Sequence, residues 1–456
     1  MKMRFTPLNN IKSIKAMKSI QKTLFLTIFV FLFSPVALAQ QLYVGAAKRI
    51  TTPDLEWLPL SGVARSNLIG VIDDIYVRVI ALSNGDEPSL IVTFDAGGPP
   101  DASTFLVGLS QHTGIPIEAI YYGATHGHTS PSVRVNPDIP STELYVNFVY
   151  DQMIEAADEA IKNLQPASVG IGYSKSYINV NRQRFYELEE GDVVGAQGYN
   201  PTGPSDKTLS VIRFSDMTGD PIAFVVHYSM HLTSMYANRL TEDGTGISGD
   251  VGGQVSRHLE NKFDGAIANW IPGTAGNQNP ILSNEYFTPN PVTGKQEIQM
   301  MSRAVVELME FYGKIQFADA LTALNNIETE TSTARISYAK GLSSLPPYDA
   351  STQENAIIGL SLMRIGDIAL AGTGGELFNE IGVYMQEHSL LEHTLVSNQV
   401  RTHVEGDDQP ISGYQPNDYA LVHDGWHTNN RRYAIGSVEG GYTNLMNKLI
   451  KSTDQN

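Results

Sequence analysis

Two histidines that lie two residues apart, His126 and His128, are the residues of this sequence best suited to chemistry. They follow the apolar run Ile115–Tyr122, which we expect to form a strand. In an extended chain, side chains at positions i and i+2 point to the same face, so both imidazoles would leave the strand on one side. Neutral imidazole is a common zinc ligand. The spacing therefore indicates a metal site, with a merely polar loop as the alternative.

A catalytic zinc ion needs three or four protein ligands, and further candidates lie downstream. His227 and His231, at the end of the expected strand Pro221–His227, are alternatives for one position. Glu376 follows a second expected strand, and the glycines before it allow a sharp turn that exposes its carboxylate. The chain has no cysteine, so a metal has to be held by His, carboxylate, Tyr or backbone oxygen.

The elements that must position these residues are a mixture of strands and helices. Runs rich in β-branched residues predict strands at Ile75–Leu82, Ser89–Phe94, Ile115–Tyr122, Leu209–Phe214, Pro221–His227, Ala356–Arg364 and Asp367–Ala371. Apolar residues at helical spacing predict helices at Thr142–Leu164, Gly252–Phe263 and Glu297–Tyr312. The proline-containing stretch Gly341–Glu354 predicts a surface loop. Strands and helices do not strictly alternate, so we expect a mixed α/β (α+β) fold: a single large domain with mixed β-sheets flanked by helices.

Residues 1–39 have the pattern of a secretory signal peptide. A basic lead precedes the apolar stretch Leu24–Phe33, and Ala37-Leu38-Ala39 is a typical cleavage site. The apolar stretch is only roughly ten residues long, too short to span a membrane comfortably, although an uncleaved anchor is the alternative. We therefore expect residues 40–456 to form a periplasmic or secreted catalytic domain without a stable membrane span.

Charge narrows the choice of partners. The formal net charge is −17, and removal of residues 1–39 leaves 25 basic against 48 acidic residues, a charge of −23. Phosphate binding needs clustered Lys and Arg, so this composition excludes nucleic acid as a partner. It suits a soluble secreted protein. The sequence leaves the oligomeric state open.

Five short sequence elements, two of them in two parts, indicate a protein family when they are taken together and in order. They are Ala124–Pro131, His231–Met235 with Ser248–Asp250, Thr274–Pro280, Arg364–Asp367 with Gly375–Glu376, and Ser412–Pro416. In sequence and order they resemble the neutral/alkaline non-lysosomal ceramidase family. The resemblance covers almost the whole chain after residue 40 and implies the fold of that family's catalytic domain.

The resemblance also implies a metal site. In that family two His, one Glu and one Tyr hold one zinc ion. Matched residue by residue, the ligands here would be His126, His231, Glu376 and Tyr414. This assignment prefers His231 to His227. It prefers Tyr414 to Tyr419 and Tyr433, which lie close by in the sequence.

Roles for neighbouring residues follow from the same resemblance. His128 would be catalytic, orienting the attacking water or stabilising negative charge, and Tyr414 would assist it. Arg182 matches a substrate-binding Asn-Arg element, with Arg184 as its competitor. Asp250 would either support a ligand histidine or cap the helix that follows it.

Three departures indicate a divergent member that is not a true ceramidase. Asn279 stands where ceramidases carry a serine, and we expect its amide to bind substrate by hydrogen bonding. The sequence ends soon after Tyr414, so we expect no C-terminal β-sandwich module. The run Asp424–Arg432, with Trp426, His427, Asn429 and Asn430, suggests a polar, aromatic pocket wall suited to a hydrophilic substrate.

Three functions remain open from the sequence. The first is a secreted zinc-dependent hydrolase in which activated water attacks an amide-type acyl bond of an N-acyl lipid or related substrate. The second is a metal-dependent carbohydrate-active enzyme, a lyase or hydrolase of acidic oligosaccharides, in which zinc and Arg182 neutralise a uronate carboxylate. The third is a non-catalytic binding protein with the same fold.

Overall fold

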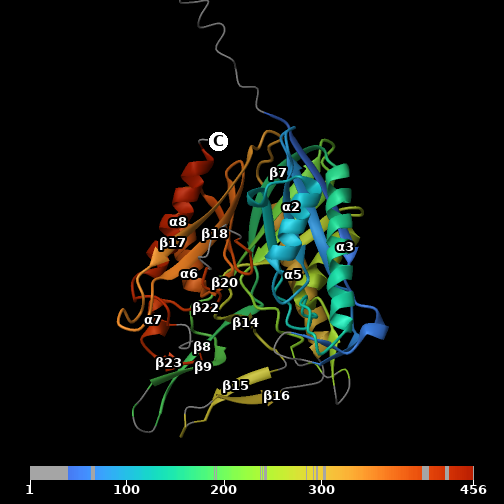
Figure 1. Cartoon of the computed structure of the whole chain (residues 1–456). Coiled ribbons are helices and arrows are strands. Elements are labelled where there is room, and N and C mark those ends of the chain that lie inside the picture. The colour runs from blue at the N-terminus through green and yellow to red at the C-terminus, as the bar shows by residue number, and fades with distance from the viewer. Residues whose placement is uncertain are drawn as a thin grey trace, which may run out of the picture. The chain divides into compact units, whose positions relative to one another are not determined.

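An eight-stranded mixed sheet forms the central layer of the fold in the computed structural model (Figure 1). Its strands, in spatial order, are β13 (Ile267–Pro272), β11 (Pro221–Tyr228), β10 (Thr208–Asp216), β7 (Gln165–Lys175), β1 (Leu42–Ile50), β4 (Tyr76–Ser83), β5 (Ser89–Phe94) and β6 (Ile120–Ala124). The pairs β5–β6 and β11–β13 are parallel, and the other pairs are antiparallel. Strands such as β4 and β5 are buried on both faces, which explains why they read as continuous apolar runs.

Helices cover one face of this sheet. They are α2 (Val107–Thr113), α3 (Ser141–Lys162), α4 (Asp250–Lys262) and α5 (Val305–Asn325). Val149 and Met153 of α3 lie on one side of the helix and pack in the same core as Val79 and Val92 of the sheet. At the other end of the sheet, Trp270 packs in a core with residues of α4 and α5.

The opposite face packs against a second sheet. This sheet contains β17 (Ile336–Leu345), β18 (Ala356–Ile365), β19 (Ile368–Gly372) and β21 (His393–Ser397). Ile80 and Ile212 of the first sheet share a core with Met363 and Leu370 of the second. The outer face of the second sheet is covered by α6 (Asn379–Glu387) and α8 (Val438–Thr453). The layers therefore run helix, sheet, sheet, helix (Figure 1).

Short strands and helices complete the fold. The small sheets are β2 (Leu60–Ser61), β3 (Asn67–Val71) and β12 (Thr245–Ile247); β14 (Gln278–Pro280), β8 (Asn179–Glu187), β9 (Val193–Asn200) and β23 (Asp424–Gly425); β15 (Glu285–Pro289) and β16 (Gln296–Met300); and β20 (Gly375–Leu377) and β22 (Gly413–Gln415). The short helices are η1 (Leu55–Trp57), η3 (Ala102–Leu106), η4 (Ile117–Ala119) and α7 (Asp418–Leu421). The parallel pair β20–β22 places Glu376 opposite Tyr414, residues 38 positions apart in the sequence.

The structure describes residues 40–454 apart from 63–66, 189–190, 192, 237, 239, 241–243, 284, 291, 294–295, 301–304, 403–409 and 427–430. The signal peptide expected at residues 1–39, and His427, Asn429 and Asn430 of the expected pocket wall, lie outside the described residues. Among the described helices, none is both long and apolar enough to cross a membrane.

The expected fold class is confirmed, while three local predictions are wrong. The expected helix Glu297–Tyr312 starts too early, because residues 296–300 pair with β15 as strand β16 and the helix runs from Val305 to Asn325. The expected loop Gly341–Glu354 begins inside β17, which ends only before the two prolines that cannot continue a strand ladder. The expected strand Ile115–Tyr122 opens with the 3-10 turn η4, and the strand itself is β6.

Candidate metal centre

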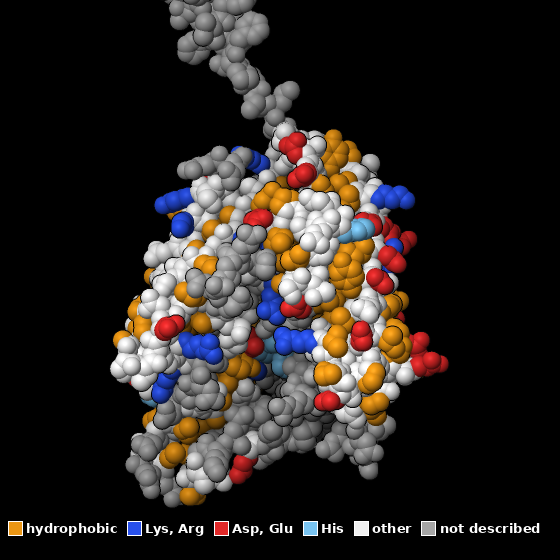
Figure 2. All heavy atoms as spheres, viewed as in Figure 1, with side chains coloured by type: hydrophobic (Ala, Val, Ile, Leu, Met, Phe, Trp, Pro, Cys, Tyr) orange, Lys and Arg blue, Asp and Glu red, His pale blue; other side chains and the backbone are white. Residues whose placement is uncertain are grey.

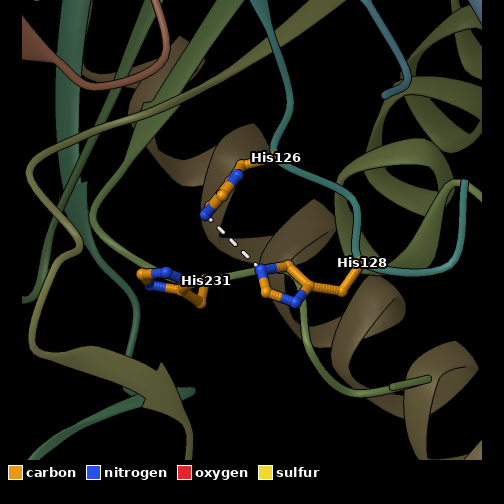
Figure 3. A group of neighbouring side chains, drawn as sticks. All are labelled: His126, His128 and His231. Atoms are coloured by element: carbon orange, nitrogen blue, oxygen red, sulfur yellow. Dashed lines mark hydrogen bonds between the residues drawn. The ribbon is translucent and has the colours of Figure 1, made fainter. Parts of the chain in front are cut away.

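His126 and His128 leave the end of β6 in a turn and not in an extended chain. His126 has a φ of 63°, in the left-handed region that non-glycine residues seldom adopt. Gly127 N–H donates to the carbonyl of Ala96 at 3.1 Å, and His128 N–H donates to the carbonyl of Leu232 at 3.1 Å. The expectation that i, i+2 alternation aligns the imidazoles is therefore wrong: the turn brings their Nε2 atoms to 3.4 Å (Figure 3).

His231 joins this pair from the segment after β11. Its N–H donates to the carbonyl of Gln278 at 3.1 Å, and an isolated bridge between Gly127 and Leu232 ties its segment to the His126 turn. The three rings converge (Figure 3), and one ligand atom from each of His126, His128 and His231 lies within 4.8 Å of the other two. This group could therefore bind a metal ion.

Backbone carbonyls fix the orientation of two of these rings. Nδ1 of His126 lies 2.5 Å from the carbonyl oxygen of Gly97, and Nδ1 of His231 lies 2.6 Å from that of Ala275. A carbonyl oxygen can only accept, so each Nδ1 carries the proton. Each Nε2 then presents a lone pair to the centre, the arrangement that typically supports metal-ligating histidines.

Glu376 faces the same centre from β20. Its Oε2 atom lies 3.0 Å from Nε2 of His231 and 3.5 Å from Nε2 of His126. Burial alone would raise the pKa of Glu376, but the charge of His126 and the hydrogen bonds with His126 and His231 hold it well below its ordinary value. The carboxylate is therefore ionised.

With Nδ1 of His126 and His231 protonated, their Nε2 atoms and the Glu376 carboxylate are acceptors that face one another, so either a further proton on an imidazole or a metal ion would satisfy them. Burial, followed by the charge of Arg182, lowers the pKa of His231 to about 3. Burial, followed by the charges of His126 and His231, lowers the pKa of His128 well below its ordinary value. Ligands at zinc-bond lengths of about 2.0–2.1 Å in a tetrahedron are separated by about 3.3 Å. The observed separations of 3.0, 3.4 and 3.5 Å match this spacing, so the residues present fit a metal ion such as zinc.

Tyr414 and Arg182 lie beside the cluster. Nη2 of Arg182 donates to the Tyr414 hydroxyl at 3.1 Å and lies 3.0 Å from Nε2 of His231. Burial raises the pKa of Tyr414 to about 12, with Glu376 adding to the rise and Arg182 opposing it. Tyr414 is therefore a neutral phenol in the absence of a bound cation.

Asn279 reaches the cluster only through Arg182. Its Oδ1 atom accepts from Nη1 of Arg182 at 3.1 Å and from the hydroxyl of Thr233 at 3.3 Å. Arg182 is only 4% exposed, and its Nε and Nη2 also donate to the carbonyl of Gly276. These contacts make Arg182 a residue that orients His231 and Tyr414. The substrate-binding roles expected for Arg182 and Asn279 stay predictions.

The competing candidates lie elsewhere. His227 is buried with its Nε2 at 3.0 Å from the carbonyl oxygen of Val396, and Tyr433 donates to the carbonyl of Pro416 at 2.7 Å. Tyr419 is 61% exposed, and exposed Arg184 donates to the carbonyl of Tyr199 at 3.3 Å. The structure therefore brings together His126, His128, His231, Glu376, Tyr414, Arg182 and Asn279, whose chemical roles stay predictions.

Asp250 is linked to the cluster indirectly, through the segment that follows His231. Its carboxylate accepts from the N–H of Met235, in the turn after His231, at 3.0 Å and from the N–H of Val251 at 2.6 Å. It is the first residue of α4, with Gly249 in the N-cap position, so it is not the cap itself. Asp250 joins the His231 segment to the helix.

A cavity of about 330 Å³ opens onto the cluster. His126 and Glu376 line it, together with Pro99, Pro131 and Val133. Figure 2 shows a hollow on this face with a pale-blue histidine inside and blue Lys or Arg side chains at its edge. The carbonyls of Gly97 and Ala275 and the cavity residues Arg134 and Arg401 were not predicted from the sequence. Any residue supplies a backbone carbonyl, so the carbonyls leave no signal in the sequence, whereas arginine could have been considered as an anion-binding residue type.

Trp426 of the expected pocket wall lies against Tyr414 and Arg182 and is not among the described residues that line the cavity, so its role as a pocket wall stays a prediction. Its ring meets the Tyr414 ring edge-on, with centroids 4.6 Å apart, and Arg182 lies 5.3 Å from the Trp426 centroid. Phe378 stacks on its other side. Trp426 thus restricts the movement of Tyr414 and Arg182.

Comparison with known proteins shows which solved structures share this fold. No protein-family model matches the chain. Neutral ceramidase B of Dictyostelium discoideum is 30% identical over 166 residues, a match that spans 34% of this chain and 21% of that relative. The crystal structure of neutral ceramidase from Pseudomonas aeruginosa matches 91% of this chain and 75% of its own, with a TM-score of 0.67 and 15% identity. A structure of ceramidase complexed with C2 matches 91% of this chain and 76% of its own, with a TM-score of 0.66 and 15% identity.

These matches confirm the resemblance inferred from the five sequence elements at the level of the fold. The described residues form a neutral-ceramidase-like domain with a divergent sequence.

Proposed function

We propose that this protein is a secreted or periplasmic zinc-dependent hydrolase that cleaves an amide-type acyl bond in an N-acyl lipid or a related N-acyl compound. The observation that carries the proposal is the convergence of Nε2 of His126, Nε2 of His231 and Oε2 of Glu376 without a donor among the three. The likeness in fold to ceramidases supports the substrate class, and the pattern of residues 1–39 supports secretion.

His126, His231, Glu376 and Tyr414 would hold one zinc ion. When bound, zinc polarises a carbonyl and lowers the pKa of water to about 7. His128, whose lowered pKa keeps it neutral, has one unprotonated ring nitrogen that could accept a proton from the attacking water. Tyr414 is a neutral phenol without a bound cation. As a zinc ligand it would have a lowered pKa, and its oxygen could accept a hydrogen bond that orients the attacking water.

Zinc content and turnover test this function together. The purified protein is expected to contain about one zinc ion per chain, and to hydrolyse a fluorescent N-acyl amide after zinc is restored to a chelated sample. His126→Ala is expected to abolish both. His227→Ala is the matched control, because His227 is buried outside the cluster, and it should retain zinc. Protein that takes up no zinc would exclude the proposal.

The role of His128 needs a separate measurement, since its Nε2 is also close enough to be a ligand. His128→Ala is expected to retain zinc and to lower kcat by about 10²–10⁴-fold, the usual worth of a general base. Loss of zinc in this variant would make His128 a ligand instead of a proton acceptor.

The alternative of an acidic-oligosaccharide lyase or hydrolase has no support from the likeness in fold, because the matching structures are ceramidases. An unsaturated product absorbing in the ultraviolet, formed from uronic-acid oligosaccharides, would establish elimination in place of hydrolysis.

A further inference from the structure

Two arginine side chains line the cavity that leads to the histidine cluster. Arg134 is exposed in the loop after His128, and Arg401 is half-buried in the segment after β21. Both share the cavity with His126 and Glu376. A ligand in the cavity would therefore meet the arginines and the cluster together.

Backbone hydrogen bonds hold the two segments that carry these arginines. The N–H of Arg401 donates to the carbonyl of Tyr122 in β6 at 2.9 Å. The N–H of Ser132, two residues before Arg134, donates to the carbonyl of Ser61 in β2 at 2.8 Å. The backbone of each arginine segment is thus anchored to a strand, and both side chains line the cavity.

Neither guanidinium is neutralised within the described part of the chain. No Asp or Glu there forms an ion pair with Arg134 or Arg401, and Nε of Arg401 is buried without a hydrogen-bond partner. Burial, and then the like charge of Arg134, lowers the pKa of Arg401; the nearby acid that opposes this is Asp101. A buried guanidinium N–H without an acceptor costs free energy, so this arrangement favours an anion.

Ion pairs are common among the described arginines. Arg49, Arg78, Arg213, Arg257 and Arg364 pair with Asp or Glu, whereas exposed Arg184, away from the cavity, donates only to a backbone carbonyl among the groups that the structure describes. The chain has 48 acidic residues against 31 basic ones, so carboxylates are abundant. Arg134 and Arg401 differ in that both line one cavity and have no ion pair among the described residues, so the pair points to an external acceptor.

We propose that the substrate carries a carboxylate near its scissile acyl bond, bound by Arg401 and Arg134, as in an N-acyl amino acid. This inference rests on the proposed hydrolase function and deepens it by naming the charge of the substrate. A guanidinium binds a carboxylate through two parallel N–H···O bonds, a geometry that a neutral head group cannot reproduce. The cavity of about 330 Å³ suits a compact acidic head, since small-molecule sites span about 300–1,000 Å³.

The test compares two substrates that differ only in charge, N-dodecanoylglycine and N-dodecanoylglycinamide, on the zinc-loaded full chain. The wild-type protein is expected to prefer the carboxylate by at least about tenfold in kcat/KM. Arg401→Gln is expected to remove most of this preference through a higher KM for the acid, with the amide unaffected. Arg401→Lys should restore part of it. Arg184→Gln, which removes an exposed arginine outside the cavity, is the matched control.

A binding measurement separates this inference from the hydrolase proposal. Calorimetry of N-dodecanoylglycine with the inactive His126→Ala variant should show binding that weakens when Arg401→Gln is added. Equal turnover of both compounds, unchanged by Arg401→Gln, would overturn the anionic substrate and leave the hydrolase intact. Arginine-dependent binding of the acid by a wild-type protein that hydrolyses neither compound would support the anion site and contradict the hydrolase. Cleavage of uronic-acid oligosaccharides alone would overturn the N-acyl substrate.

Discussion

Two clusters of buried charged or titratable groups lie beside neighbouring strands of the central sheet and are built in opposite ways. In the first, which we call the Arg78 cluster (Lys48, Arg78, Asp95 and Glu260), every close contact joins a cation to an anion. Nη1 of Arg78 donates to Asp95 at 2.8 Å and its Nε to Glu260 at 2.9 Å, while Lys48 lies 2.6 Å from Glu260. In the second, the histidine cluster (His126, His128, His231 and Glu376), acceptors face acceptors.

The difference distinguishes a cluster that stabilises the fold from one that could bind a ligand. Asp95 directly follows β5, and His126 follows the parallel neighbour β6, so similar positions at one sheet edge serve both clusters. The Arg78 cluster pairs each of its cations with a carboxylate, although Nη2 of Arg78 is buried without a hydrogen-bond partner among the described residues. In the histidine cluster the close contacts join acceptor atoms, an arrangement that could bind a metal ion.

Replacing the glutamate of each cluster with glutamine contrasts the two clusters most directly. The larger effect on the free energy of unfolding is expected at Glu260. Glu260→Gln leaves the charges of Arg78 and Lys48 without their shared carboxylate in a buried site. We expect the free energy of unfolding to fall by about 4 kcal/mol, the cost of breaking a buried ion pair by removing one partner. Urea denaturation of the metal-free protein measures it. A change below about 1 kcal/mol would show that the cluster behaves as an exposed pair.

Glu376→Gln is expected to have the opposite pattern. Its amide group can donate to the Nε2 lone pairs of His231 or His126, so the metal-free protein should lose no stability. Stabilisation by zinc, about 2.7 kcal/mol at 100-fold excess over Kd, should be lost. Thermal unfolding with and without zinc tests this, and Glu260→Gln should keep the zinc effect. Destabilisation of the metal-free Glu376→Gln protein would place Glu376 among the structural carboxylates.

How much of this was predictable depends on whether a contact is made by side chains or by backbone. The types and approximate places of His126, His231, Glu376 and Tyr414 are written in short motifs beside predicted strands, and the fold follows from apolar runs and the family resemblance. The carbonyls of Gly97 and Ala275 that orient the histidines have no sequence signature, because any residue supplies a carbonyl. The left-handed turn at His126 was also missed, since histidine gives no strong signal for positive φ.

The pH dependence of stability tests the role of Asp250, which joins the segment after His231 to helix α4. Asp250 binds the turn after His231, and its helix α4 carries Glu260 near the other end. Burial raises the pKa of Asp250 to about 6, whereas an unfolded Asp titrates near about 3.9. Between these values the folded state holds the extra proton, so this contribution to stability falls as pH rises from about 4 to 6. Asp250→Asn should remove about 2 kcal/mol of that pH dependence, measured by urea denaturation at both limits. Identical pH profiles for wild type and variant would contradict the assignment.

The smallest effect is expected at Arg182, a donor that contacts the histidine cluster. Nη2 of Arg182 lies 3.0 Å from Nε2 of His231, and Asn279 holds the same guanidinium through Nη1 at 3.1 Å. Asn279→Ala removes this acceptor and with it a hydrogen bond that contributes about 1 kcal/mol. Arg182 is then less well oriented toward His231 and Tyr414, so kcat should fall about fivefold while KM stays unchanged. Asn279→Asp keeps an acceptor for Arg182 and should retain most of kcat. If Asn279→Ala instead raises KM alone, the amide contacts the substrate directly and the serine-to-asparagine departure affects recognition more than orientation.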